Sequence, residues 1–334
     1  MKTLISLLGM VLIVIVSHAS AQNEGQLVPQ DKLQFSLAPS VGVHLGYTKY
    51  VMDLKYQEEN FVIARIKSEL KFPLDMLLIG GQLDLSYFSG GERDWALSAA
   101  VHTNVNDPWS EMIDDDWDGT TQTRLEQFSH TESNAELSAI MVDLTATRYF
   151  HHGRNTDLGL VLGLIYQRLD YDIIGYKGWK NDSLGVRQYV SSTADALDYV
   201  VTYTMPTFGA ELIYGTQSRS KGRFVVSAGP VFASDYDNHL LRNKDATADG
   251  TGYGITSEFT GRFPLSTETG GQQVYLGLDA ALAYMHVEGE QTQTWYGNDD
   301  ATEDFDDTGL VLTKIPHDFT SLQYRAGLKL IMTF

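Results

Sequence analysis

The 334-residue chain contains no cysteine, and only 24 lysine and arginine residues stand against 43 aspartate and glutamate residues. Without cysteine the chain forms no disulfide and offers no thiolate as a nucleophile. The formal charge of -19 argues against nucleic acid as a partner and favours a cationic substrate. After residue 21 no stretch approaches the roughly 20 unbroken apolar residues of a membrane-spanning helix. A helical membrane protein is therefore excluded, and any membrane span must consist of strands.

The first 21 residues have the three zones of a secretory signal. Met1-Lys2-Thr3 is followed by an apolar run from Leu4 to Val16 and then by the small residues Ala19-Ser20-Ala21. We expect cleavage after Ala21, which leaves residues 22–334 as the mature protein. That part has no linker, low-complexity tract or internal repeat, so we expect it to form a single domain.

The C-terminal segment shows most clearly how the mature chain is built. Its alternating residues form one mostly apolar set and one mixed set: Tyr324, Ala326, Leu328, Leu330, Met332 and Phe334 against Arg325, Gly327, Lys329, Ile331 and Thr333. A transmembrane strand has one face toward lipid and one toward the lumen, and its backbone groups all pair within a closed sheet. The alternation at the C-terminus is typical of such a strand. The aromatic last residue also resembles the insertion signal of outer-membrane barrels.

The same alternation recurs at residues 62–72 and 158–164. Followed along the chain, it predicts ten strands, near residues 33–48, 61–88, 95–104, 134–149, 157–172, 198–215, 222–234, 253–264, 273–288 and 316–334. Short turns are expected at 89–94, 151–156, 216–221 and 265–271, and long polar loops at 49–60, 105–133, 173–197, 235–252 and 289–315. An even strand number puts both termini and the short turns in the periplasm. The fold class expected is an all-β, ten-stranded antiparallel transmembrane barrel with long extracellular loops.

Two acidic clusters lie where predicted strands pass into outer loops. One contains Asp114 and Asp116, and the other contains Asp237 and His239. Residues two apart in an extended segment point the same way, so each pair shares a face. If both faces look into the barrel mouth, His239 can act as a general base oriented by Asp237, while the aspartate pair positions a water molecule and shares a proton. This pattern indicates hydrolysis by an activated water, with no covalent nucleophile.

Non-catalytic interpretations of the same residues stay open. Acidic loop segments often bind calcium or keep a surface solvated. Asp116 and His239 could also bind a metal, but the spacing matches no zinc or EF-hand pattern, so we expect no metal and no cofactor. The alternative function is a non-enzymatic adhesin or narrow pore, although a ten-stranded bore could be filled by Arg65, Lys67, Arg325 and Lys329. Several histidines, His317 among them, have no partner that the sequence identifies.

The clusters resemble those of the omptin family, outer-membrane aspartic-type endopeptidases built on ten-stranded barrels. The resemblance covers nearly the whole mature chain. It is carried by Trp95, Ala99-Ala100, Met112-Ile113-Asp114-Asp115-Asp116-Trp117, Asp235-Tyr236-Asp237-Asn238-His239 and Ala326-Gly327-Leu328-Lys329 onward to Phe334, with weaker matches at Gly46-Tyr47-Thr48-Lys49, Ser68-Glu69-Leu70, Tyr166-Gln167 and Met205-Pro206.

The resemblance implies a catalytic set of Asp114, Asp116, Asp237 and His239, facing the outside of the cell. It implies cleavage of cationic peptides or proteins at or between basic residues, the residue before the scissile bond being bound by two acids. Asp235 matches one of these acids. Tyr50 replaces the other, and Asp53 and Glu58 are the nearest carboxylates in the sequence.

The resemblance also implies outer-membrane lipid as a partner. Family members bind lipopolysaccharide, an activating lipid, on the outer face of the barrel. Tyr166 matches that site, while Arg168 and Asp170 stand where the opposite charges are expected. Tyr166 and Arg168 are therefore the candidate lipid-binding residues.

Overall fold

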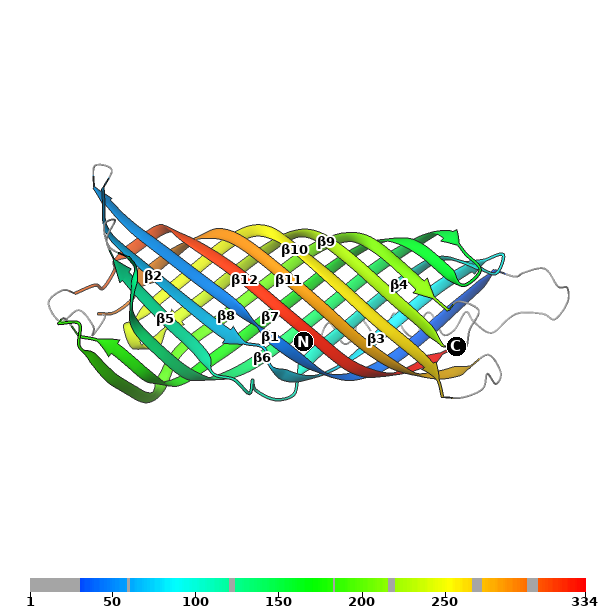
Figure 1. Cartoon of the computed structure of the whole chain (residues 1–334), viewed down its shortest axis with the longest axis horizontal. Coiled ribbons are helices and arrows are strands. Elements are labelled where there is room, and N and C mark those ends of the chain that lie inside the picture. The colour runs from blue at the N-terminus through cyan, green and yellow to red at the C-terminus, as the bar shows by residue number, and fades with distance from the viewer. Residues whose placement is uncertain are drawn as a thin grey trace.

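The structure is a computed structural model that describes residues 31–58, 61–119, 124–182, 184–215, 220–265, 272–298 and 306–334. The predicted signal segment, residues 1–21, lies outside the described residues. The described chain forms one antiparallel sheet of twelve strand segments, which closes on itself because β12 pairs with β1. Figure 1 shows the resulting barrel from the side, with long strands tilted against its axis. Among the described residues no helix is long and apolar enough to cross a bilayer.

The strands are β1 (Lys32–Glu58), β2 (Phe61–Pro73), β3 (Met76–Ser89), β4 (Glu92–Asn104), β5 (Met112–Gly119), β6 (Glu126–His152), β7 (Thr156–Asn181), β8 (Arg187–Tyr214), β9 (Lys221–His239), β10 (Lys244–Pro264), β11 (Gln273–Trp295) and β12 (Val311–Thr333). A single 3-10 turn, η1 (Leu240–Arg242), separates β9 from β10.

The twelve segments occupy ten positions around the barrel. β3 pairs with the first half of β1 and β2 with its second half, so these two segments lie end to end. β4 and β5 lie end to end in the same way along β6. Two positions are thus shared by two segments each, and the predicted ten-stranded barrel is confirmed.

Most strands are longer than predicted. Much of the sequence expected to form long loops, such as residues 173–181 and 244–252, continues the hydrogen-bonded ladders of β7 and β10. Apolar alternation stops there because these parts leave the lipid, but the backbone pairing of a closed sheet does not depend on apolar side chains. We call this end of the barrel the extended end, and the opposite end, which carries the short turns, the short-turn end.

A belt of outward apolar side chains marks the membrane-spanning part. On β12 the outward residues Tyr324, Leu328, Leu330 and Phe334 are all between 44% and 50% exposed, whereas the inward Lys329 is buried. The lipid-facing and lumen-facing sets predicted for this strand are therefore confirmed. On β9 the belt runs from Phe224 to Phe232. A continuous outward apolar band is what a barrel in lipid requires.

The apolar set of β2 faces the opposite way. Leu70 and Phe72 point into the lumen and are almost completely buried. β2 lies beyond the belt, where the outside is aqueous and the inside must be filled. Phe72 belongs to a buried cluster of aromatic side chains from several strands, which fills the lumen at this level. We call this cluster the aromatic floor, and it consists of Tyr50, Phe72, Tyr171, Tyr199, Tyr203 and Phe319.

The prediction for the basic residues of the lumen is half right. Arg325 and Lys329 do lie inside, where they contact Asp143, Asp279 and Glu258. Arg65 instead pairs with Asp53, and Lys67 pairs with Glu69 and covers the ring of Trp117. Both remain partly exposed.

Candidate active site

β9 carries three polar residues of the site on one face. The burial of β9 alternates, so that Asp235, Asp237 and His239 all point inward while Tyr236 points outward. Asp235 comes three residues after Phe232, the last outward apolar residue of the belt on this strand. The inward carboxylates therefore lie beyond the membrane-spanning part, inside the extended end.

The turn after β9 holds His239 in place. η1 follows directly, and Asn243 then adopts a left-handed φ of 48°, a conformation that asparagine tolerates better than most residues. The end of β11 supports this turn, because the backbone N–H of Tyr296 donates to the carbonyl of Asn243 at 2.9 Å. The Tyr296 hydroxyl also donates to the side-chain oxygen of Asn238 at 3.0 Å.

Asp237 and His239 form a buried contact, here called the dyad. The Nε2 of His239 lies 3.1 Å from Oδ2 of Asp237, and the carboxylate of Asp237 is completely buried. Burial lowers the pKa of His239 below the usual histidine range, and Lys244 acts in the same direction, while Asp237 opposes both. The imidazole is therefore neutral at neutral pH and can accept a proton.

Asp114 and Asp116 form the second half of the site, here called the aspartate pair. They point inward from β5, where Asp114 pairs with Leu70 of β2 and Asp116 with Ser68. A β-bulge follows Asp116, where the register against β6 shifts. Bulges re-aim side chains and are common beside active sites. Asp115, between the two, points the other way and contacts His130 at 2.6 Å.

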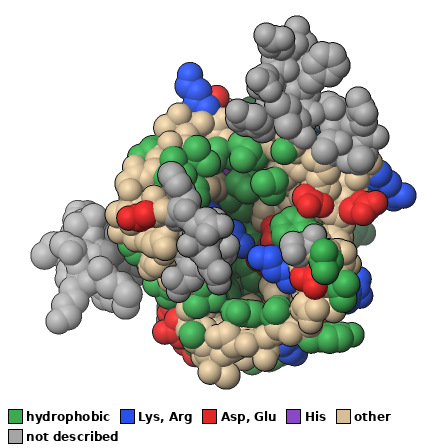
Figure 2. All heavy atoms as spheres, turned by 90° about the vertical axis from the view of Figure 1, so that its left-hand side faces the viewer, with side chains coloured by type: hydrophobic (Ala, Val, Ile, Leu, Met, Phe, Trp, Pro, Cys, Tyr) green, Lys and Arg blue, Asp and Glu red, His purple; other side chains and the backbone are tan. Residues whose placement is uncertain are grey.

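The dyad and the aspartate pair act on each other electrostatically across the lumen. Burial raises the pKa of Asp114 to about 8, and the charges of Asp116 and Asp237 add to this effect. The hydroxyl of Tyr50 is influenced by Asp114, Asp235 and Asp237 together, and its pKa is raised mainly by burial. The structure thus brings all four predicted residues to the same level of the barrel. Figure 2 shows this end from outside, with charged and apolar side chains around a central hollow.

Asp235 lies one step deeper on β9 and has a partner that sequence reasoning missed. The Nε2 of His317, on β12, is 3.3 Å from Oδ2 of Asp235, and both side chains are completely buried. Nothing in the sequence links two residues 82 positions apart, because only the closure of the barrel brings β12 near β9. Of the two nearby acids, Asp53 is held by Arg65, and the side chain of Glu58 is outside the described part.

Lys244 and Gln291 are two further residues near the site that the sequence did not indicate. Lys244 is buried, pairs with His239 in the β9–β10 ladder and donates to Gln293 at 3.4 Å. The side-chain amide of Gln291 donates to the Tyr50 hydroxyl at 3.0 Å. Polar residues that are buried on the inner face of a strand were the available signal, but the predicted loop assignment of 235–252 and 289–315 hid that face.

The candidate lipid-binding residues lie on the outer surface. Tyr166 and Arg168 follow Leu160, Leu162 and Leu164 on the outward face of β7, just past the belt. Arg168 donates to Asp170 at 3.1 Å.

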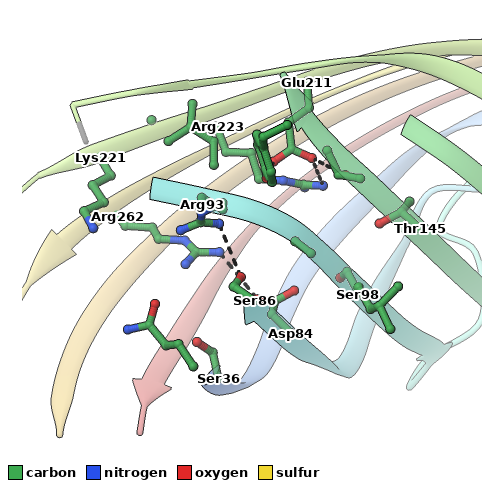
Figure 3. A pocket seen from close by; sticks show the side chains of 17 residues that line it. Ser36, Asp84, Ser86, Arg93, Ser98, Thr145, Glu211, Lys221, Arg223 and Arg262 are labelled. Atoms are coloured by element: carbon green, nitrogen blue, oxygen red, sulfur yellow. Dashed lines mark hydrogen bonds and ion pairs between the residues drawn. The ribbon is translucent and has the colours of Figure 1, made fainter. Parts of the chain in front are cut away.

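A cavity of about 40 Å³ lies away from these residues, at the short-turn end. Figure 3 shows Arg93, Arg223 and Arg262 around it, reaching toward acidic and hydroxyl side chains of neighbouring strands. Arg223 contacts Glu211 at 3.2 Å and Glu258 at 3.4 Å. These are charge pairs between strands, with no histidine among the residues that line the cavity.

Comparison with known proteins agrees with the barrel fold. The sequence profile of the omptin family matches residues 31–263, well over half of the chain. The chain belongs to the omptin family. Among solved structures, the outer membrane protease OmpT from Escherichia coli covers 94% of this chain and 100% of its own, with a TM-score of 0.69 and 16% identity. This likeness establishes an omptin-type barrel fold.

Two other solved structures share little of this fold. Two structures of the outer membrane protein OmpT of Vibrio cholerae reach TM-scores of only 0.14 and 0.13, at 11% and 10% identity, over 88% and 92% of this chain and 99% and 100% of theirs. None of the curated proteins matches the sequence. The site must therefore be judged by its own geometry.

Proposed function

We propose that this omptin is an outer-membrane endopeptidase that hydrolyses peptides with a water molecule activated by His239. The observation that carries the proposal is the buried Asp237–His239 contact facing an aspartate pair in which burial raises the pKa of Asp114. A neutral histidine held by a buried carboxylate is a suitable general base. The chain offers no cysteine for a covalent route.

In the proposed reaction, the His239 nitrogen facing away from Asp237 takes a proton from water as the oxygen attacks the peptide carbonyl carbon. Asp237 stabilises the imidazolium that forms. Asp114, protonated at neutral pH because of its raised pKa, donates a hydrogen bond to the developing oxyanion. Collapse of the tetrahedral intermediate breaks the C–N bond, and the imidazolium returns its proton to the leaving amine. The site is then restored.

The substrates we propose are cationic polypeptides outside the cell, cleaved at or near basic residues. The net charge of -19 supports electrostatic attraction of such substrates to the extended end. This requires that end to face the exterior, in keeping with the short turns at the other end. Activation by lipopolysaccharide remains a prediction, supported by the position of Tyr166 and Arg168 beside the belt.

The alternative, a non-enzymatic barrel, divides into two cases. A narrow pore is disfavoured because the aromatic floor and the charge pairs around Arg325 fill the described lumen. An adhesin that binds cationic partners would need acidic loops but no buried dyad. The two functions therefore differ in whether bound peptide is cut.

The test uses the purified full-length protein, reconstituted with and without lipopolysaccharide and given peptides that contain adjacent basic residues. We expect cleavage by the wild type and none by His239→Ala. His286→Ala is the matched control, because His286 contacts Thr320 and Glu288 and no residue of the site. Full activity of the His239→Ala variant would refute the mechanism, and binding without cleavage by the wild type would favour the adhesin.

A further inference from the structure

A second aspartate–histidine pair lies beneath the dyad, and the proposed chemistry does not use it. Asp235 precedes Asp237 by two residues on the same inward face, so a substrate side chain directed from the dyad into the lumen points toward it. His317 already occupies that place, 3.3 Å from the Asp235 carboxylate, and neither side chain has exposed surface. A substrate side chain could therefore reach the carboxylate only by displacing His317.

Aromatic rings and amides also pack around the pair. The ring of Tyr50 lies 4.2 Å from that of His317, and the Tyr50 hydroxyl is hydrogen-bonded by Gln291 at 3.0 Å. Gln293 in turn donates to Gln291 at 2.7 Å. His317 also packs edge-on against Phe319 at 4.1 Å. Because neither Asp235 nor His317 has exposed surface, a substrate side chain here meets an aromatic ring and amides before it meets the carboxylate.

A basic side chain would have to break the Asp235–His317 contact before it could pair with Asp235. Burying a lysine or arginine is unfavourable unless a carboxylate accepts it. Here the carboxylate lies against His317, and the ammonium group of Lys244 already lies beside Gln293, 3.4 Å from its side-chain oxygen. An uncharged side chain avoids this cost.

We infer that His317 and Tyr50 determine specificity, and that the substrate side chain over the Asp235–His317 pair is uncharged. This inference rests on the proposed peptidase function. It changes the expectation that Asp235 binds a basic residue, because the acid is present but is completely buried against His317. Basic residues elsewhere in the substrate still contribute through the overall negative charge of the protein.

The first test is a mixed peptide library cut by the reconstituted wild-type protein, with both new termini sequenced. We expect the residue before the scissile bond to be uncharged in most products. A matched pair of peptides of equal net charge, with arginine or leucine at that position, gives the ratio of kcat/KM values. We expect this arginine-to-leucine ratio to be below one. Strict cleavage after arginine or lysine would overturn the inference while leaving the peptidase function intact, and no cleavage at all would contradict the function itself.

The second test removes the two side chains that cover Asp235. In a Tyr50→Ala/His317→Ala double variant, Asp235 is uncovered and has lost its partner, so the arginine-to-leucine ratio should rise at least about tenfold, as expected for a charged pocket. Adding Asp235→Asn should abolish that gain, and His317→Gln alone should keep the wild-type ratio. An unchanged ratio in a folded double variant would contradict the inference. If the double variant does not fold, the wild-type library decides.

Discussion

The two ends of the lumen both contain buried carboxylates, but they balance them with different partners. At the short-turn end Glu211 and Glu258 contact Arg223, and deeper in the lumen Asp279 contacts Lys329. At the extended end Asp237 contacts His239, and Asp235 contacts His317. Arginine and lysine stay charged at all physiological pH values, whereas histidine changes charge near neutrality.

This difference separates a structural role from a chemical one. A carboxylate paired with arginine is fixed in its ionised form and ties two strands together. A carboxylate beside a neutral histidine, facing another carboxylate with a raised pKa, belongs to a set of groups that can move protons. We therefore expect substitutions at the extended end to change turnover and substitutions at the short-turn end to change stability.

The largest expected effect is on turnover. Asp237→Asn leaves the shape of the dyad but removes the charge that stabilises imidazolium, so kcat should fall by about 10⁴. The variant should keep the wild-type resistance to thermal and denaturant unfolding, since it removes a buried charge that has no arginine or lysine partner within ion-pair distance among the described residues. Peptide cleavage assays and unfolding curves on the same preparation measure both. A loss of stability with normal turnover would show that the extended end has a structural and not a chemical role.

Arg223→Met tests the structural role of the short-turn end. It leaves Glu211 and Glu258 without their shared cation, and breaking such a buried pair typically costs about 3–5 kcal/mol. The free energy of unfolding in detergent or lipid should fall by that amount while kcat stays unchanged. The double replacement of Glu211→Gln and Arg223→Met should recover part of the loss. A large fall in kcat in the folded variant would show that the two ends are coupled.

The smallest effect concerns substrate capture. If cationic peptides are drawn in by the net negative charge, kcat/KM at low substrate should fall a few-fold when the ionic strength rises from about 0.01 to 0.15 M. Turnover at saturating peptide should not change, because the buried dyad is not screened. A neutral peptide of the same length is the control. An equal salt effect on both peptides would argue against electrostatic attraction.

The sequence was informative where lipid imposes a pattern. The alternation ending at Phe334 predicted the lipid and lumen faces of β12, and its recurrence along the chain predicted the ten-stranded barrel. Past the belt no such pattern exists, so the sequence predicts loops at residues 173–197 and 235–252, although most of their described backbone belongs to β7, β8, β9 and β10. The direction of a strand's apolar face also depends on which side is wet, which is why Leu70 and Phe72 face inward.

The site could be predicted in part for the same reason. Asp114 and Asp116, like Asp237 and His239, are neighbours in sequence, so local spacing gave each pair. His317 is brought to Asp235 only by the closure of the barrel, and no local pattern encodes that contact. Partners that depend on register across several strands need the structure.

The central claim is that a neutral His239 takes the proton of water while a protonated Asp114 donates a hydrogen bond to the oxyanion, and the pH dependence of kcat/KM tests it most directly. Because the pKa of His239 is lowered, the base stays neutral and activity should persist as pH falls below about 6.5. Because the pKa of Asp114 is raised to about 8, activity should decline as pH rises through that value and the carboxyl loses its proton. In Asp114→Asn, whose amide keeps a donor at every pH, the residual activity should lose this alkaline decline. An alkaline limb that is unchanged in Asp114→Asn would contradict the account.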